Sequence, residues 1–281
     1  MEILLTGANG FIGKNILEGL GNGHTIHCVS RNSNINILDI NSLLKISKID
    51  LVIHCAAKTF IPDSFKEPFQ FYEFNFLSTL NIAEFCRIKK IKKLIYLNAY
   101  PYGVPQYLPI DESHPLEPHS PYNSSKIIAE NLLFSYLKNI TKVISLRVFN
   151  IYGKYQLQNF LIPNIISQIK ESDKVTLNDL RPKRDFLYIQ DLIILLNNII
   201  SDTKNIGIYN VGYGRSYSIK EVVDAISIVF NKKITLKTIQ KKRQNEILDL
   251  YADINKVKSS FNWSPKFSIL DGMKHYYKNE K

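Results

Sequence analysis

An alternation of short apolar runs with segments of helical periodicity constrains the fold of this chain most strongly. Five strand-length runs recur within the first 150 residues: EILLT, TIHCV, LVIHCAA, KLIYL and KVISLRVF. Between them, segments such as 15–20 and 74–88 carry apolar residues at helical spacing. Fully apolar strands belong in a parallel sheet that is covered by helices on both faces. The alternation therefore predicts an α/β fold with a Rossmann-like, doubly wound parallel sheet.

The pattern changes after about residue 150, where Pro163, Pro182 and Pro265 punctuate mixed helices and short strands. This change indicates a smaller second lobe interleaved with the last elements of the sheet. We expect residues 1–150 with 182–206 to form the sheet domain, and 151–181 with 207–281 to form a mixed α/β C-terminal lobe.

The charge balance suits an anionic partner, because the net charge of the 281 residues is +11. The basic residues lie in short scattered groups, without an arginine-rich arm, a zinc-finger pattern or an RNP signature. A small phosphate-bearing ligand therefore fits better than nucleic acid. Three cysteines, an odd number without metal-ligand spacing, predict neither a disulfide nor a metal site.

The N-terminus runs straight from MEILLT into a glycine turn, and the apolar runs are too short to span a bilayer. We therefore expect no signal peptide, no membrane partner and a cytoplasmic location.

The glycine turn Thr6 to Gly13, TGANGFIG, follows the first predicted strand and opens a helix. Glycines at this spacing allow a tight turn, a close backbone approach to a pyrophosphate at the helix N-terminus, and close helix-to-strand packing. Three glycines can also form an ordinary loop. Their place at the first strand-to-helix junction of an alternating chain favours a dinucleotide site.

The choice between dinucleotides depends on the end of the second strand. An acid there would bind the ribose 2′-hydroxyl of NAD, and an arginine would accommodate the 2′-phosphate of NADP. The chain has Ser30-Arg31-Asn32 at this point, and Asp39 comes too late to be the ribose acid. We therefore favour NADP(H). NAD(H) stays possible if Arg31 is only a surface residue.

Tyr122 and Lys126 are four residues apart in the helical segment that follows Pro121. A neighbouring ammonium favours a phenolate, so we expect Lys126 to lower the pKa of Tyr122 and to suit it for proton exchange with a substrate hydroxyl. Such a pair is common by chance on helices. It gains weight only from the other motifs.

Further motifs follow in order along almost the whole chain. They are Thr6 to Gly13, His54-Cys55-Ala56-Ala57, Tyr102-Gly103, Pro121-Tyr122 to Lys126, Leu146 to Gly153, Arg184-Asp185-Phe186, Tyr209 to Gly212, Arg243 through Glu246 with Ala252-Asp253, and Trp263. Together they resemble the extended short-chain dehydrogenase/reductase family of NAD(P)-dependent nucleotide-sugar epimerases, dehydratases and 4-keto reductases.

The resemblance implies roles at individual positions. Tyr122 would be the catalytic acid/base, with Lys126 and Asn98 beside it. The cofactor would contact Gly7, Asn9, Gly10, Phe11, Ile12, Gly13, Arg31, Asp39, Ile40, Ala56, Ala57, Lys58, Asn75, Tyr122, Lys126 and Phe149. The nucleotide sugar would contact Asn98, Tyr100, Asn150, Arg184, Arg243 and Glu246. The sheet domain would then bind the dinucleotide, the C-terminal lobe would bind the nucleotide sugar, and two copies would pair as a homodimer.

Two of the implied substrate residues have simpler interpretations. Arg184 can form a salt bridge to Asp185, and Arg243 can belong to a solvated basic face.

Asn98 departs from the family pattern, in which Ser or Thr usually stands five positions before the glycine of Tyr102-Gly103. An amide can still donate to a carbonyl oxygen, but it lacks a hydroxyl's ability to donate and accept through one atom. This favours a reductase over an epimerase. Alternatively, Asn98 is a structural amide, and Tyr100 or a water takes the catalytic position.

Other departures bear on the reaction. Ala99-Tyr100 replace the acidic pair of the dehydratases, and Arg243 to Glu246 lacks the glycine of the epimerases. The sequence thus predicts NADPH-dependent reduction of a nucleotide-linked 4-keto sugar for surface polysaccharide. The alternatives are a nucleotide-sugar 4-epimerase and a non-catalytic dinucleotide sensor.

Overall fold

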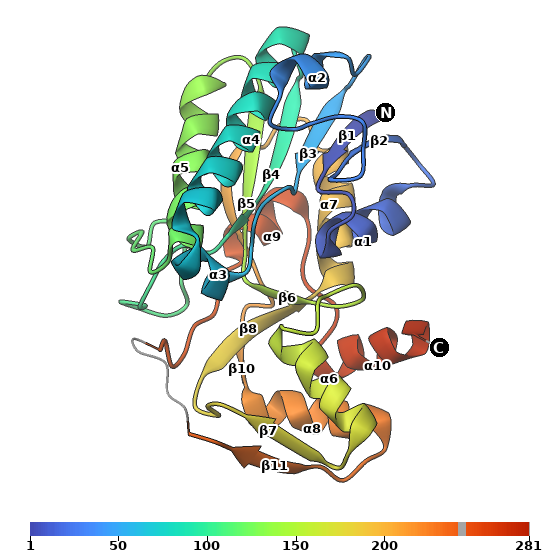
Figure 1. Cartoon of the computed structure of the whole chain (residues 1–281), viewed down its shortest axis with the longest axis vertical. Helices are drawn as coiled ribbons and strands as arrows, with labels where there is room; N and C mark the ends of the chain where they lie inside the picture. The colour runs from blue at the N-terminus through green and yellow to red at the C-terminus, as the bar shows by residue number, and fades with distance from the viewer. Residues whose placement is uncertain (241–245, 281) are drawn as a thin grey trace. The chain divides into compact units, whose positions relative to one another are not determined.

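The computed structural model describes residues 1–240 and 246–280 (Figure 1). Contacts divide the chain into two compact units. Unit 1 contains Met1–Gly103, Pro115–Val148 and Ser201–Asn210, and unit 2 contains Val104–His114, Phe149–Ile200 and Val211–Lys281. Within the described ranges, no helix is long and apolar enough to cross a membrane, and no group of three or more His, Cys, Asp or Glu could hold a metal ion.

Unit 1 is built on a parallel sheet, as the apolar runs predicted. The strands are β1 (Glu2–Thr6), β2 (Thr25–Val29), β3 (Leu51–His54), β4 (Lys93–Ala99), β5 (Lys142–Val148) and β9 (Gly207–Val211). Their order is β2-β1-β3-β4-β5-β9, and the neighbouring pairs from β2 to β5 are parallel. The predicted Rossmann-like α/β fold is confirmed.

Helices alternate with these strands along unit 1. They are α1 (Phe11–Leu20), α2 (Ile40–Leu44), α3 (Ile61–Lys66), α4 (Pro68–Lys89) and α5 (Pro121–Tyr136). Helix α5 begins where the sequence indicated, because Pro121 occupies its first turn and the Ser120 hydroxyl accepts from Asn123 N at 3.1 Å. Helices α4 and α5 lie side by side (Figure 1) and bury residues such as Ile82 and Leu133 in the core.

Unit 2 is a mixed α/β unit. Its strands are β6 (Asn150–Tyr152), β7 (Lys174–Leu177), β8 (Lys183–Tyr188), β10 (Ser216–Ser218) and β11 (Thr235–Thr238). Its helices are α6 (Leu161–Glu171), α7 (Ile189–Ser201), α8 (Ile219–Phe230), α9 (Asn255–Phe261) and α10 (Ile269–Glu280). Strands β10, β8 and β6 form one sheet, and β11 pairs with β7.

The compact units differ from the expected boundaries. Residues 104–114, 149–150 and 182–200 belong to unit 2 instead of the sheet domain, and 207–210 belong to unit 1 instead of the C-terminal lobe. The second difference arises because β9 is the last strand of the six-stranded sheet, next to β5. The division of the chain into a dinucleotide-binding and a substrate-binding part stays a prediction.

Candidate active site

The glycine turn between β1 and α1 brings backbone segments unusually close together. Gly7 has φ of +74°, and a Cβ there would lie 2.8 Å from Ala56 N. A Cβ on Gly13 would lie 2.2 Å from the Gly7 carbonyl oxygen. Gly10 caps α1 without any side-chain hydrogen bond. An anion can therefore approach the N–H groups at this helix end, so the turn fits a dinucleotide pyrophosphate.

The other predicted cofactor residues of this turn and the next loop lie where the motif placed them. Asn9 is exposed, and Phe11 and Ile12 are half-buried at the start of α1. Ala56 and Ala57 are half-buried just after β3.

The end of β2 carries an exposed arginine. Arg31 lies two residues beyond the strand and makes no hydrogen bond or ion pair with residues in 1–240 or 246–280. Asp39, in contrast, has an intramolecular partner. Its Oδ1 accepts from Asn41 N at 2.9 Å and caps α2, which begins at Ile40. The structure thus leaves Arg31 available to a phosphate, while Asp39 has a local role in its helix.

A chain of buried hydrogen bonds runs from β1 through His54 to α4. The Thr79 hydroxyl donates to the Asn75 carbonyl at 2.7 Å, so its oxygen accepts from His54 Nε2 at 3.1 Å. Nδ1 of His54 then accepts from the Thr6 hydroxyl at 2.6 Å, and the Thr6 oxygen accepts from Ala56 N at 3.2 Å. Burial lowers the pKa of His54 to about 3, and the imidazole is therefore neutral.

Asn75 continues this chain towards the helix of Tyr122. Its Oδ1 accepts from Lys58 N at 2.8 Å, and its Nδ2 donates to the Lys58 carbonyl at 3.2 Å and to Ser125 Oγ at 2.9 Å. Ser125 Oγ in turn donates to the Tyr122 carbonyl at 2.8 Å. The structure thus connects Lys58, Asn75 and Tyr122, three residues predicted to contact the cofactor. Their contact with it stays a prediction.

Lys126 lies in the interior of unit 1, one turn of α5 after Tyr122. Its side chain is buried, its Nζ donates to the Leu97 carbonyl at 2.9 Å, and Nζ lies 4.0 Å from the centre of the Tyr96 ring. Burial lowers the pKa of Lys126 to about 7. The lysine is therefore only partly charged near neutral pH.

The structure corrects the expected effect of Lys126 on Tyr122. Burial raises the pKa of Tyr122 well above that of a free tyrosine, and the nearby Tyr100 hydroxyl raises it further. The predicted lowering is wrong because desolvation of the phenolate has the largest effect on the pKa of Tyr122. Tyr122 is a neutral phenol, a form that can donate a proton.

Asn98 points into the protein at the end of β4. Its side chain is 4% exposed, its Nδ2 donates to Glu130 Oε2 at 2.9 Å, and its Oδ1 accepts from Ala99 N at 2.9 Å. This geometry agrees with the alternative in which Asn98 is a structural amide. Tyr100 is half-buried and close enough to Tyr122 to affect its pKa. A catalytic role for Asn98 stays a prediction.

Glu130 is the centre of a buried polar network that the sequence analysis missed. It accepts from Ser145 Oγ at 2.6 Å and from Arg147 Nη2 at 2.5 Å. Arg147 Nη1 donates to the Tyr102 hydroxyl at 2.9 Å, and Tyr102 donates to Asn210 Oδ1 at 2.5 Å. Tyr102 is thus a buried anchor of the strand end. A glutamate eight residues after Tyr122, on the same face of the helix, was the available signal.

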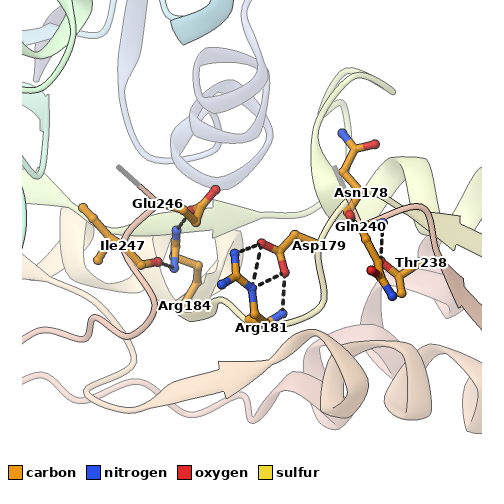
Figure 2. A network of polar contacts seen from close by, with 8 residues as sticks. All are labelled: Asn178, Asp179, Arg181, Arg184, Thr238, Gln240, Glu246 and Ile247. Carbon is orange, nitrogen blue, oxygen red and sulfur yellow. Dashed lines mark hydrogen bonds and ion pairs between the residues drawn. The ribbon is translucent and has the colours of Figure 1, made fainter. Parts of the chain in front are cut away.

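The predicted substrate residues of unit 2 include an ion pair between Arg184 and Glu246 (Figure 2). Arg184 Nη1 also donates to the Ile247 carbonyl at 2.6 Å and to the Lys183 carbonyl at 2.8 Å. The structure therefore brings together two residues that are far apart in sequence. Arg243 lies outside the described residues.

Asp185 is not the partner of Arg184. It is completely buried and accepts from the backbone N–H groups of Tyr213 at 2.6 Å, Gly214 at 3.0 Å and Ala252 at 3.1 Å. Asn150 Nδ2 donates to the Asp185 carbonyl at 3.3 Å. The carboxylate therefore joins β8 to two later segments, which gives Asp185 and Ala252 a structural role.

Phe149, the remaining predicted cofactor residue, is buried in unit 2 and donates its backbone N–H to the Val211 carbonyl at 2.9 Å.

Comparison with known proteins agrees with this arrangement. Residues 3–212 match the model of the NAD dependent epimerase/dehydratase family. A putative UDP-glucose 4-epimerase of Methanocaldococcus jannaschii is 31% identical over 299 residues, covering 97% of this chain and 96% of that protein. GDP-6-deoxy-D-talose 4-dehydrogenase of Aggregatibacter actinomycetemcomitans is 29% identical over 265 residues, covering 90% of this chain and 86% of that protein.

Among solved structures, RMD from Pseudomonas aeruginosa complexed with NADPH is similar, with a TM-score of 0.88 and 25% identity over 99% of this chain and 98% of that chain. This chain belongs to the NAD dependent epimerase/dehydratase family and is an NAD(P)-dependent enzyme of the extended short-chain dehydrogenase/reductase type.

Proposed function

We propose that this enzyme uses NADPH to reduce the keto group at C4 of a nucleotide-linked sugar, giving a deoxysugar or related nucleotide sugar for surface polysaccharide. The observation that carries this proposal is the placement of Tyr122 in the first turn of α5, one turn before the buried Lys126. Burial raises the pKa of Tyr122, so this residue is a phenol in the neutral range. A ketone reduction requires a proton donor of this kind.

The reduction adds a hydride to the C4 carbon and a proton to its oxygen. NADPH supplies the hydride. Tyr122 donates its phenolic proton to the oxygen, and the ammonium of Lys126, one helical turn away, favours the phenolate that results. The bond from Lys126 Nζ to the Leu97 carbonyl holds the lysine in place while Tyr122 exchanges its proton.

Asn98 is less suited to polarise the C4 oxygen than its sequence position suggested, because its Nδ2 donates to Glu130. Tyr100 fits that part better, since it is half-buried beside Tyr122. The preference for a reductase therefore no longer rests on the amide at position 98.

Arg31 supports NADPH as the cofactor. It is exposed beyond β2 and free of intramolecular partners in the described ranges, and the segment Ser30–Asn32 has no acid that could bind a ribose 2′-hydroxyl. A planar guanidinium suits the 2′-phosphate. RMD, a similar protein, has been solved with NADPH.

Arg184 supports a nucleoside diphosphate as the recognition group of the substrate. Its guanidinium is half-buried and held in orientation by the Ile247 carbonyl and Glu246. A fixed guanidinium can bind phosphate through two parallel hydrogen bonds. Arg243, from sequence, is the second candidate for the diphosphate.

A nucleotide-sugar 4-epimerase is the second candidate function. It is favoured by the 31% identity to a putative UDP-glucose 4-epimerase over almost the full length of both chains. An epimerase removes and returns the same hydride. It therefore retains its cofactor and produces no net oxidation.

The two functions are separated by incubating the purified protein with NADPH and a panel of nucleotide 4-keto-6-deoxy sugars. A reductase oxidises NADPH in proportion to the sugar consumed, and Tyr122→Phe abolishes the reaction. If no panel member consumes NADPH, and the protein interconverts unreduced nucleotide hexoses with cofactor retained from purification, the enzyme is an epimerase.

A further inference from the structure

We propose that the aromatic ring of Tyr96 is a positioning group for Lys126, which holds the lysine ammonium on its face inside unit 1. This inference rests on the proposed function only in giving Lys126 a catalytic use. Neither the geometry nor the test below depends on which reaction the enzyme performs.

The first observation is the place of the ammonium. Lys126 is 2% exposed, and its Nζ lies 4.0 Å from the centre of the Tyr96 ring. An ammonium has three N–H donors, and the Leu97 carbonyl accepts from one of them at 2.9 Å. The electron-rich ring face is the natural partner for the remaining positive charge in a site with almost no water.

The second observation concerns the Tyr96 hydroxyl. It is buried, and within residues 1–240 and 246–280 it makes no hydrogen bond of normal geometry, although the Thr79 hydroxyl is close enough to act on its pKa. A buried hydroxyl without a partner costs stability, so the hydroxyl does not account for a tyrosine at this position. The aromatic ring accounts for the residue at this position, because it makes the close contact with Lys126.

The third observation is that the ring is fixed. The imidazole of His54 stacks on Tyr96 with ring centres 5.6 Å apart and planes 25° apart. His54 is itself held on both sides, by Thr6 and Thr79. The orientation of the Tyr96 ring beside Lys126 is therefore fixed by its neighbours.

The other titratable groups around Lys126 give it less support. His54 is neutral because burial lowers its pKa to about 3, and burial raises the pKa of Cys55 to about 12, so this residue stays a thiol. Tyr122 is a phenol, and the side chain of Glu130 is paired with Arg147. Cys55 and Glu130 also favour the charged form of Lys126, while the Tyr96 ring and the Leu97 carbonyl contact its Nζ directly.

The test is a direct titration of Lys126 in the intact protein labelled with 13C-lysine. The Cε resonance is assigned as the one missing from Lys126→Met, and its shift is followed with pH by NMR. The wild-type midpoint should lie at about 7. Tyr96→Phe keeps the ring and removes the unpartnered hydroxyl, so its midpoint should match the wild type.

Tyr96→Leu removes the ring, and its midpoint should fall by about one pH unit, a tenfold change in the acid dissociation constant. If this variant does not fold, judged by far-UV circular dichroism, Tyr96→Met fills the volume without a ring and should give the same fall. Equal midpoints in the Phe variant and the ringless variant would overturn the proposal. No substrate is used, so a failure of the proposed reduction leaves this result intact.

Discussion

Replacing Glu130 by glutamine should destabilise the protein far more than the small chemical change suggests. The Glu130 and Arg147 side chains are 0% and 3% exposed, and their charged atoms lie 2.5 Å apart. Oε2 of Glu130 accepts from Asn98, Ser145 and Arg147 Nε, so a glutamine would keep its carbonyl oxygen there. Its amide NH₂ would then face Arg147 Nη2, donor against donor.

The arginine would be left as a buried cation without an anion. Breaking a buried ion pair in this way costs about 3–5 kcal/mol. The free energy of unfolding is measured by urea denaturation, followed by circular dichroism at constant pH. Activity is not needed for this measurement.

Glu84→Gln is the matched control, because Glu84 also pairs with an arginine, Arg87, at 2.6 Å. Here the two side chains are 25% and 49% exposed, and the loss should stay below about 1 kcal/mol. The reasoning is refuted if the Glu130 variant is no less stable than the Glu84 variant.

Three further predictions concern the ligands and the buried lysine. Arg31→Ala should raise the KM for NADPH about tenfold or more and leave the KM for NADH unchanged, as measured by steady-state kinetics with both cofactors. An equal rise for both cofactors would show that Arg31 does not bind the 2′-phosphate. Because the pKa of Lys126 is lowered to about 7 in the folded protein and is near 10.4 when unfolded, the unfolded state binds more protons between these values. The free energy of unfolding should therefore rise from pH 7 towards pH 10 more steeply than in Lys126→Met, and parallel curves would contradict the assigned pKa. Arg184→Lys keeps the charge but loses the planar guanidinium that can bind phosphate through two hydrogen bonds. It should raise the KM for the nucleotide sugar about tenfold without changing the KM for NADPH. An unchanged KM for the sugar would show that Arg184 does not bind the diphosphate.

The fold was predictable because its main signals are local. Each apolar run of the first 150 residues is a strand of the sheet, and Pro121 marked the start of α5. The sequence analysis placed residues 207–210 in the other lobe, whereas they lie in β9, the strand next to β5. The five residues of β9 carry no local signal that predicts pairing with β5.

The motifs name candidate residues for the site, but the energetics of these residues depend on the folded chain. The motifs identified Tyr122, Lys126 and Asn98, since residue type and spacing are written in the sequence. The pKa of Tyr122 depends on how much packed protein surrounds it, which no spacing reveals. Asn98 turns towards Glu130, a partner 32 residues away, and only the folded chain brings the two together.

The most direct test of the proposed reduction follows the hydride itself. The enzyme is incubated with NADPH deuterated at the transferable position of the nicotinamide and with the nucleotide 4-keto sugar that it consumes, and the product is analysed by mass spectrometry and NMR. The account predicts one deuterium at C4 of the sugar for each NADP⁺ formed, and no product from Tyr122→Phe. A sugar that inverts at C4 without taking up deuterium from the added cofactor would contradict it.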